Sequence, residues 1–172
     1  MGGEPGLIVR RVVRIRATPA RVLSAFFEPD ELGRWWDVSH AVVTPRPLTP
    51  YAVQWPATSF RDEVLGRLGG TLHGMLLDYQ HGSGFFIADA YYTPPETGPI
   101  GPMAIEIQVR PLEEGRSTEL TVRQSAEEEE ARWRHYFAIV GDGWDRALEG
   151  LREHLEWSGT RPHRSHTWEE RA

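Results

Sequence analysis

The sequence predicts an α+β fold in which a run of β-strands precedes one long C-terminal helix. Between residues 40 and 125, apolar and polar residues alternate in short runs separated by turn residues, which is typical of half-buried strands. From Trp133 to Leu155, apolar residues recur at spacings of three and four, which indicates one helix with a buried stripe. Two short helical segments lie between the first strand and the later ones.

Length and composition favour one globular domain. The 172 residues fit a single domain, and 40% hydrophobic and 26% charged residues are ordinary globular values. We expect this domain to cover residues 1–157 and a polar tail to cover residues 158–172. No apolar run approaches the roughly 20 residues of a membrane span, and the first residues lack the apolar core of a signal peptide. These observations favour a cytoplasmic protein with no membrane span.

The residue types that are missing exclude several kinds of chemistry. Without cysteine, there can be no disulfide, thiolate nucleophile or cysteine-ligated metal. All 19 positively charged side chains are arginine, so neither a Schiff-base lysine nor a phosphate-loop lysine is available. A net charge of −6 and dispersed arginines argue against nucleic-acid binding. We therefore expect no cofactor and no nucleic-acid partner.

The first strand and the first helix are predicted at the N-terminal end. Residues 7–16 alternate β-branched residues with arginines, as in a strand with one wet face. Thr18 can cap the following helix, and Pro19 suits its first position because no backbone N–H is needed there. The helix should cover about residues 20–27 and end at Pro29.

A second short helix should deliver two neighbouring tryptophans. Asp30 can cap this helix, which runs into Trp35 and Trp36. Adjacent residues do not share a helix face, so the two indoles should serve different surfaces. One should fill the space between the short helices and the C-terminal helix, and the other should lie on the rim of the sheet.

The middle of the chain reads as six strands joined by turns. A tight turn is expected at residues 113–115. Residues 93–102 are too rich in proline and glycine for a strand and should form a loop. The strands are expected at residues 40–44, 51–55, 71–79, 85–92, 103–110 and 116–124.

The long helix should begin after the four glutamates 127–130, which suit the positive end of a helix dipole. It should continue to about Trp157. Gly141 and Gly143 each weaken its middle by about 1 kcal/mol relative to alanine. We therefore expect a kink there, or a close approach of another element.

Four segments in this order resemble the helix-grip fold of the START and birch-pollen-allergen superfamily (SRPBCC). IRATPARVLSAFFEPDELGRWW is similar to the family's opening strand and paired helices, and GGTLHGMLLDY to its glycine-spaced central strand. STELTVRQS is similar to its penultimate strand, and GDGWDRALEGLREHL to its C-terminal helix. Together they cover about residues 8–156. The most specific resemblance is to bacterial homologues of the heat-shock-protein-90 ATPase activator.

The resemblance implies a curved antiparallel sheet of six to seven strands wrapped round the long helix. It also implies a cavity between them that binds a lipid-like or aromatic molecule. Members of the superfamily include carriers, polyketide cyclases, hydrolases and co-chaperone domains, so the fold alone does not give the activity. This chain departs from the branch at residues 43–66 and 93–102, where the family has plainer connections.

The histidines give little support for a metal site or a catalytic site. His163 and His166 lie close together in the tail without a third ligand nearby in the sequence, and His135 and His154 lie off the apolar stripe of the long helix and should face solvent. His73 shares its strand parity with Met75 and Leu77, so it is a polar handle for a ligand if that side faces the interior. Otherwise it is an outward-facing or satisfied residue.

No catalytic constellation is recognisable, so an enzyme is the less favoured interpretation. Neighbouring carboxylates point apart, and the serine motif of hydrolases is missing. We expect binding of a hydrophobic small molecule. The alternatives are a chaperone-interacting module and a cyclase-like or hydrolase-like enzyme, in a monomer or a homodimer. The candidate ligand-binding residues, which fill the core if no ligand binds, are Trp55, His73, Met75, Tyr91, Ile105, Ile107, Phe137 and Trp144.

Overall fold

The computed structural model describes residues 6–157, in which seven strands form one antiparallel sheet. Their order is β1-β9-β8-β7-β6-β3-β2, so the first two strands of the chain lie at opposite edges. The α+β fold and every strand expected from the alternating pattern are confirmed. The expected tail at 158–172, with His163 and His166, lies outside the described residues. The strands are β1 (Leu7–Ile15), β2 (His40–Val43), β3 (Thr49–Trp55), β6 (Gly70–Gln80), β7 (Gly84–Thr93), β8 (Ile100–Leu112) and β9 (Ser117–Ala126).

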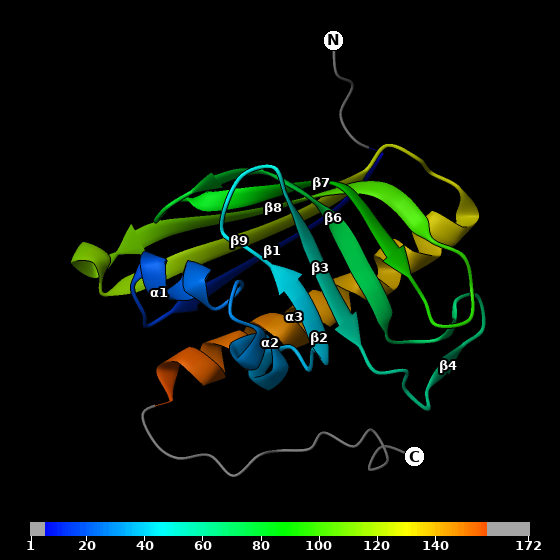
Figure 1. Cartoon of the computed structure of the whole chain (residues 1–172), viewed down its shortest axis with the longest axis horizontal. Coiled ribbons are helices and arrows are strands. Elements are labelled where there is room, and N and C mark those ends of the chain that lie inside the picture. Colours follow the sequence, from blue (N-terminus) through cyan, green and yellow to red (C-terminus); the bar gives the residue numbers. More distant parts are fainter. Residues whose placement is uncertain (1–5, 158–172) are drawn as a thin grey trace.

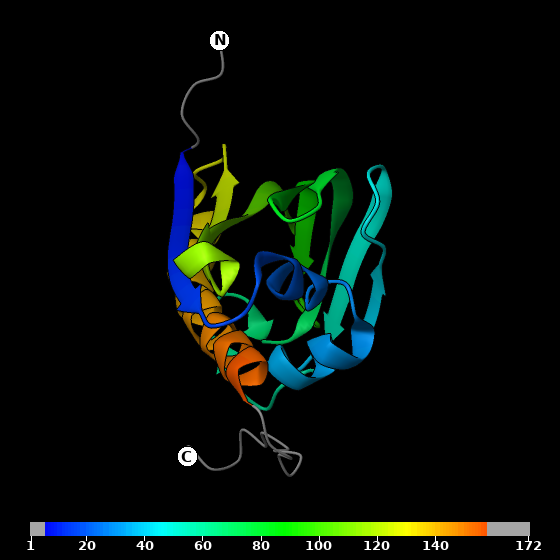
Figure 2. The same ribbon diagram turned by 90° about the vertical axis from the view of Figure 1, so that its left-hand side faces the viewer.

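Three helices lie on the concave side of the sheet. They are α1 (Pro19–Ser24), α2 (Pro29–Trp35) and α3 (Ala131–Glu156). Figure 1 shows α3 running along the length of the molecule, and Figure 2 shows the sheet curving over the helices. This is the arrangement that the sequence resemblance implied.

The structure differs from the prediction at the end of α1 and at the start of α2. The Thr18 side chain accepts a hydrogen bond from the Arg21 backbone N–H at 3.2 Å, so the predicted cap of α1 is confirmed. However, α1 already ends at Ser24, and Pro29 does not terminate it. Pro29 instead begins α2, where its fixed φ suits the first turn, and Asp30 lies in that turn and is not the cap.

The long helix is continuous through both of its central glycines. α3 begins directly after the four glutamates, as predicted, and the expected close approach occurs at Gly141. A Cβ atom there would lie 2.5 Å from Nη2 of Arg11 on β1, whereas at Gly143 nothing lies within 4 Å. The helix therefore packs against the edge strand at Gly141. The buried residues of α3 are Trp133, Tyr136, Phe137, Gly141, Trp144, Ala147, Leu148 and Leu151.

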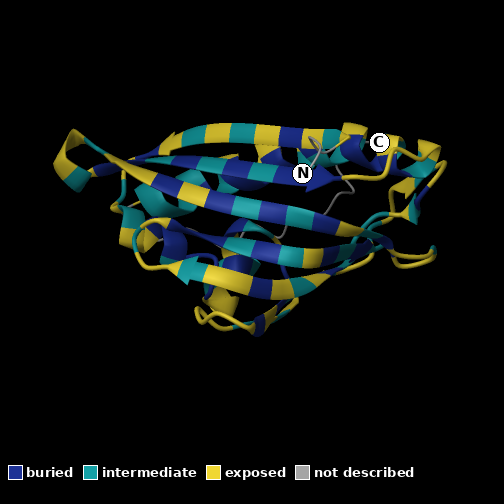
Figure 3. Cartoon of the chain, turned by 90° about the horizontal axis from the view of Figure 1, so that it is seen from above, coloured by how far each residue is buried: buried dark blue, intermediate teal, exposed yellow. Residues whose placement is uncertain are grey.

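Alternation along the strands separates a buried face from a wet one, as Figure 3 shows. On β8, Met103, Ile105, Ile107 and Val109 are all buried, so every second side chain of this strand faces the core. Together with the inward side chains of the other strands and of the helices, they form one core.

Two connections differ from the sequence prediction. Strands β7 and β8 extend into the segment expected to be a loop, because buried Ile100 pairs with Tyr92 across the strands. The loop is therefore confined to residues 94–99, and Pro102 lies near the start of β8, where proline is tolerated. The second connection contains an unpredicted pair of short strands, β4 (Arg61–Asp62) and β5 (Gly66–Arg67).

Candidate ligand site between the sheet and the long helix

An apolar cavity lies where the sheet, the short helices and α3 meet. Its volume is about 10 Å³, at the lower limit of the space that one water molecule needs. Only Tyr51 among its lining residues is ionisable; burial raises the pKa of this phenol, and its hydroxyl donates to the Phe26 carbonyl at 2.9 Å. The lining residues are Phe26, Trp36, Tyr51, Leu72, Phe85, Ile87, Ile105, Ile107 and Trp144.

Strand register brings the sheet residues of this lining together. Phe85 and Ile87 on β7 stand opposite Ile107 and Ile105 on β8. Because side chains alternate across a strand, all four point to the concave face. Trp144 of α3 closes the cavity from the helix side.

The two neighbouring tryptophans stack on each other and then make different contacts. Their ring centroids are 5.0 Å apart at an interplanar angle of 7°. Trp35 ends α2, and its indole N–H donates to the Ala25 carbonyl at 3.0 Å. Trp36 follows α2, and its backbone is no longer helical. Its ring contacts those of Trp55 and Trp144, each at a centroid distance of 5.2 Å. Trp36 alone contacts aromatic rings of both α3 and β3, so the two indoles are not divided between these surfaces as expected, and their stacking was not predicted.

Trp36 is the part of the cavity wall that reaches solvent. Every other lining residue is buried, whereas Trp36 is partly exposed. Its indole N–H has no hydrogen-bond partner among residues 6–157, and no buried side-chain nitrogen or oxygen there lacks a partner, so this N–H must touch solvent. The indoles of Trp55 and Trp144, by contrast, donate to the Trp36 carbonyl and to Gln124 Oε1, both at 2.8 Å.

A buried amide holds the α3 side of the cavity in place. Gln124 is almost completely buried, and its Oε1 accepts the Trp144 N–H. Its Nε2 donates to the Tyr136 hydroxyl at 3.2 Å and lies 3.4 Å from the Met103 sulfur. Burial of the phenol raises the pKa of Tyr136 well above its usual value. Both ends of Gln124 are therefore committed to the protein, which fixes the Trp144 ring.

Five of the eight predicted ligand residues lie in or beside the core. Ile105, Ile107 and Trp144 line the cavity. Phe137 is buried in the same core, but it does not line the cavity. Trp55 is half-buried and contacts the cavity through the Trp36 ring. Phe26 also lines the cavity but was not predicted to, although it carries the same signal of regularly spaced apolar residues.

The other three predicted residues lie on the outer face of the sheet. His73 and Met75 are exposed, and the His73 ring stacks on half-buried Tyr91 with centroids 5.7 Å apart. On β6, the buried residues Leu72 and Leu76 face inward, so His73 faces outward. His73 therefore does not reach the interior, where it could have contacted a ligand.

The prediction that His135 and His154 face solvent is wrong. Nε2 of His135 lies 2.9 Å from Oδ1 of Asp62, which joins α3 to the β4–β5 hairpin. Nε2 of His154 lies 2.9 Å from Oε1 of Glu31. Both imidazoles are mostly shielded, because each packs against a carboxylate from a distant part of the chain.

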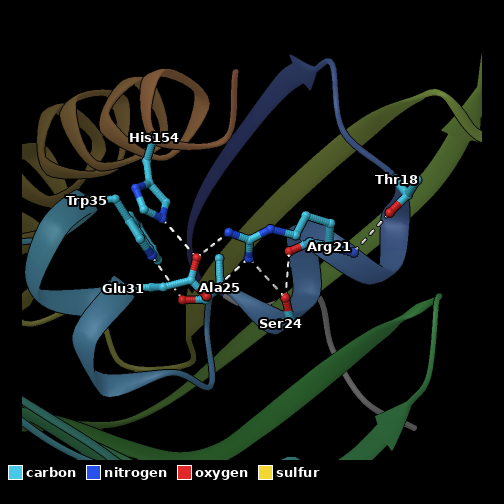
Figure 4. A network of polar contacts seen from close by, with 7 residues as sticks. All are labelled: Thr18, Arg21, Ser24, Ala25, Glu31, Trp35 and His154. Atoms are coloured by element: carbon cyan, nitrogen blue, oxygen red, sulfur yellow. Dashed lines mark hydrogen bonds and ion pairs between the residues drawn. The ribbon is translucent and has the colours of Figure 1, made fainter. Parts of the chain in front are cut away.

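Glu31 joins all three helices, as Figure 4 shows. Its carboxylate accepts hydrogen bonds from Arg21 of α1 and contacts His154 of α3. Burial acts to raise the pKa of Glu31, but the hydrogen bonds with Arg21 and His154 outweigh it and hold this pKa below its usual value. The junction fixes α2, and therefore also the tryptophan pair at its end.

Other site types receive no support within residues 6–157. No group of three or more histidine, aspartate or glutamate side chains there could hold a metal ion. No helix of this part of the chain is long and apolar enough to cross a membrane.

Comparisons with known proteins match this geometry in structure only. No protein-family model and no curated protein matches the sequence. A crystal structure of a Rhodobacter sphaeroides protein is 19% identical with a TM-score of 0.66, covering 92% of this chain and 99% of the other. The chain has the helix-grip fold.

Two further helix-grip structures carry descriptive names. The Aha1 dimer from Colwellia psychrerythraea is 15% identical with a TM-score of 0.61, covering 90% of this chain and 99% of that one. DynU16, a protein of the dynemicin biosynthetic locus, is 17% identical with a TM-score of 0.61, covering 88% of this chain and 48% of DynU16. At these identities the likeness establishes the fold and not the activity.

Proposed function

We propose that this helix-grip protein binds a small hydrophobic molecule, of a lipid-like or aromatic kind, between the sheet and α3. The observation that carries the proposal is the apolar cavity whose one solvent-reaching wall is the Trp36 indole. An apolar interior with few polar groups is the usual composition of a small-molecule site.

Binding requires Trp36 to move, because the closed cavity of about 10 Å³ cannot hold an organic molecule. Trp36 follows the last residue of α2, and its indole makes no hydrogen bond within residues 6–157 that movement would break. Trp144 is poorly suited to this movement, since its N–H is bonded to buried Gln124. The ligand therefore selects an open conformation, and its apparent affinity is reduced by the small open fraction.

The test is direct ligand titration of wild type and Trp36→Ala. Laurate and naringenin serve as lipid-like and aromatic probes, with binding followed by native mass spectrometry and calorimetry. Trp36→Ala should leave space on the order of 150 Å³, enough for a benzene-sized ring, and should bind benzene, used as a third probe, more tightly than wild type. Trp157→Ala, which removes a half-exposed indole elsewhere, is the matched control.

Two results would contradict the proposal. One is that neither wild type nor Trp36→Ala binds any of these probes. The other is that Trp36→Ala and Trp157→Ala change binding equally, because Trp36 would then have no particular relation to the cavity.

A second candidate function is a protein-interaction module, such as one that docks on a chaperone. Four exposed apolar side chains on or beside β2, β3 and β6 are taken together here as the outer apolar patch. Apolar surface of this kind marks interaction sites in many proteins. The similarity to the Aha1 dimer is compatible with a protein partner or with a homodimer. The patch consists of Val42 (64% exposed), Leu48 (74%), Met75 (37%) and Leu77 (44%).

The interaction module is tested with Met75→Asp/Leu77→Asp and with Val12→Asp, an exposed apolar position on β1. A pull-down with the host heat-shock-protein-90 chaperone and its ATPase rate are the measurements, and sedimentation gives the oligomeric state. The patch variant should lose binding while Val12→Asp retains it. Equal behaviour of both variants would remove the outer apolar patch from this role.

A further inference from the structure

A separate groove of about 460 Å³ lies at the end of the sheet where β2, β3, β6 and β7 meet their loops. Its volume is within the usual range of small-molecule sites, unlike that of the internal cavity. It is lined by Ser39, His40, Gln54, Trp55, Pro56, Ala57, Gly70, Thr71, Thr93, Pro94 and Pro95.

Four of these residues form an outer polar row, defined as His40, Gln54, Thr71 and Thr93. Their backbones stand in register: His40 opposite Gln54, Gln54 opposite Thr71, and Thr71 opposite Thr93. Their inward neighbours along the strands are buried or half-buried, so the row points outward. Four adjacent strands place it across about 14 Å.

The side chains of the outer polar row are free to bind. Within residues 6–157, none of the four makes a side-chain hydrogen bond to another protein group. Ser39 differs, since its hydroxyl donates to the Gln54 carbonyl at 3.0 Å. The row offers hydroxyl, amide and imidazole groups, which together provide both donors and acceptors.

Close packing of the loops builds the walls beside this row. Gly69 and Gly70 have φ of +103° and +95°, and a Cβ at either would overlap a neighbouring backbone oxygen, that of Pro56 or Thr93. Glycine at both positions lets the 56–57 and 94–95 segments approach β6. Exposed Pro56 and Pro95 add apolar surface, whereas the Trp55 ring points to the inner side, where its N–H donates to the Trp36 carbonyl.

We propose that this groove binds a neutral carbohydrate of one or two sugar rings. No aspartate, glutamate or arginine lines it, in a chain of which 26% is charged, so it offers no charge to select an ionic ligand. Sugar hydroxyls both donate and accept hydrogen bonds, as do the groups of the outer polar row. The apolar C–H faces of the sugar rings match the exposed rings of Pro56 and Pro95. An extended peptide fits less well, because the inner strands already pair their backbone groups within the sheet.

The test is saturation-transfer NMR and calorimetry of the full chain with maltose and cellobiose. Wild type should give saturable binding, and Gln54→Ala should weaken it about tenfold, the loss expected for one or two hydrogen bonds. Thr71→Val removes one hydroxyl while keeping the side-chain shape, and should weaken binding several-fold. Thr121→Val, an outward, half-buried threonine on β9, is the matched control and should bind like wild type.

Several outcomes would overturn the inference. Saturable binding of neither sugar, or equal losses in Thr71→Val and Thr121→Val, would remove the groove as a carbohydrate site. Tighter binding of glucuronate than of cellobiose would contradict its neutral character. Binding of a proline-rich peptide in place of the sugars would assign the groove to a protein partner.

Discussion

The two edges of the sheet differ in how they are covered. At the β1 edge, α3 packs along the strand, with Nε of Arg11 2.7 Å from Oδ1 of Asp145 and Gly141 leaving space for the guanidinium. At the opposite edge, β2 itself has only four residues, and its Val42 is 64% exposed. The same alternation of apolar and polar residues builds both sides. Among residues 6–157, the β2 side combines polar groups without side-chain hydrogen bonds, exposed apolar groups and a groove, so we expect recognition there.

Trp36, which we propose as the movable wall of the cavity, lies between these two sides. It packs against Trp144, which belongs to the covered side, and against Trp55, which lines the groove of the open side. If Trp36 moves, ligand binding in the cavity involves both sides of the sheet. If Trp36 is a fixed structural residue, recognition is confined to the β2 side.

The largest expected effect separates Trp144 from Trp36. Trp144→Ala should lower the free energy of unfolding by about 4 kcal/mol, because it removes a buried indole and leaves Oε1 of Gln124 without its donor. Trp36→Ala should cost about half of that, on the order of 2 kcal/mol, since its ring is partly exposed and its N–H is free. Urea unfolding followed by circular dichroism measures both. Equal losses would mean that Trp36 is a fixed part of the core, and the proposal that it moves to admit a ligand would be wrong.

An intermediate effect should arise at the junction of the three helices. The folded-state pKa of Glu31 is depressed, so its carboxylate stabilises the fold above its unfolded pKa, near the ordinary value of 4.5, and this stability is lost as pH falls through the lower folded pKa. Glu31→Gln should lower stability by about 1–2 kcal/mol at pH 7. Below about pH 4 the difference from wild type should shrink as the wild-type carboxylate is protonated.

Thermal unfolding at pH 7 and at lower pH tests this dependence. Glu149→Gln is the control, because it removes an exposed carboxylate that pairs with Arg152 on the same helix. Its effect should stay below about 1 kcal/mol at pH 7. A Glu31→Gln deficit that does not change with pH would assign the loss to packing and not to the charge.

The sequence was sufficient for patterns that are local. The alternation of β8 and the apolar stripe of α3 depend on neighbours two to four residues apart, so both were predicted correctly. The two faces of β6 were not distinguished, because Leu72 and Leu76 on one side and Met75 and Leu77 on the other are equally apolar. Only the curvature of the assembled sheet selects which pair is buried.

The site depended on contacts that local patterns do not encode. His135 and His154 find carboxylates 73 and 123 residues away along the chain, so their helix positions alone suggested solvent. The stacking of Trp35 on Trp36 requires the change of backbone direction at the end of α2. The outer polar row requires the register of four strands, and no single segment contains that information.

The smallest expected effect concerns Leu48 on the open side. This residue is 74% exposed and has φ of +62°, a left-handed conformation that costs a side chain other than glycine about 1–2 kcal/mol. Its N–H donates to the Leu76 carbonyl at 2.7 Å, so the sheet holds the backbone in place. Leu48→Gly should therefore raise stability by about 0.5–1 kcal/mol. Leu48→Ala keeps the strained conformation and should change stability by less than about 0.5 kcal/mol.

These two Leu48 variants separate a binding role from a packing role. If the outer apolar patch docks a partner, both should weaken chaperone binding although neither weakens the fold, since strain retained at an exposed side chain is typical of functional positions. Urea unfolding and the pull-down are read on the same samples. A loss of stability in Leu48→Ala would show that the side chain packs on the sheet, and the open side would then resemble the covered one more than its exposure suggests.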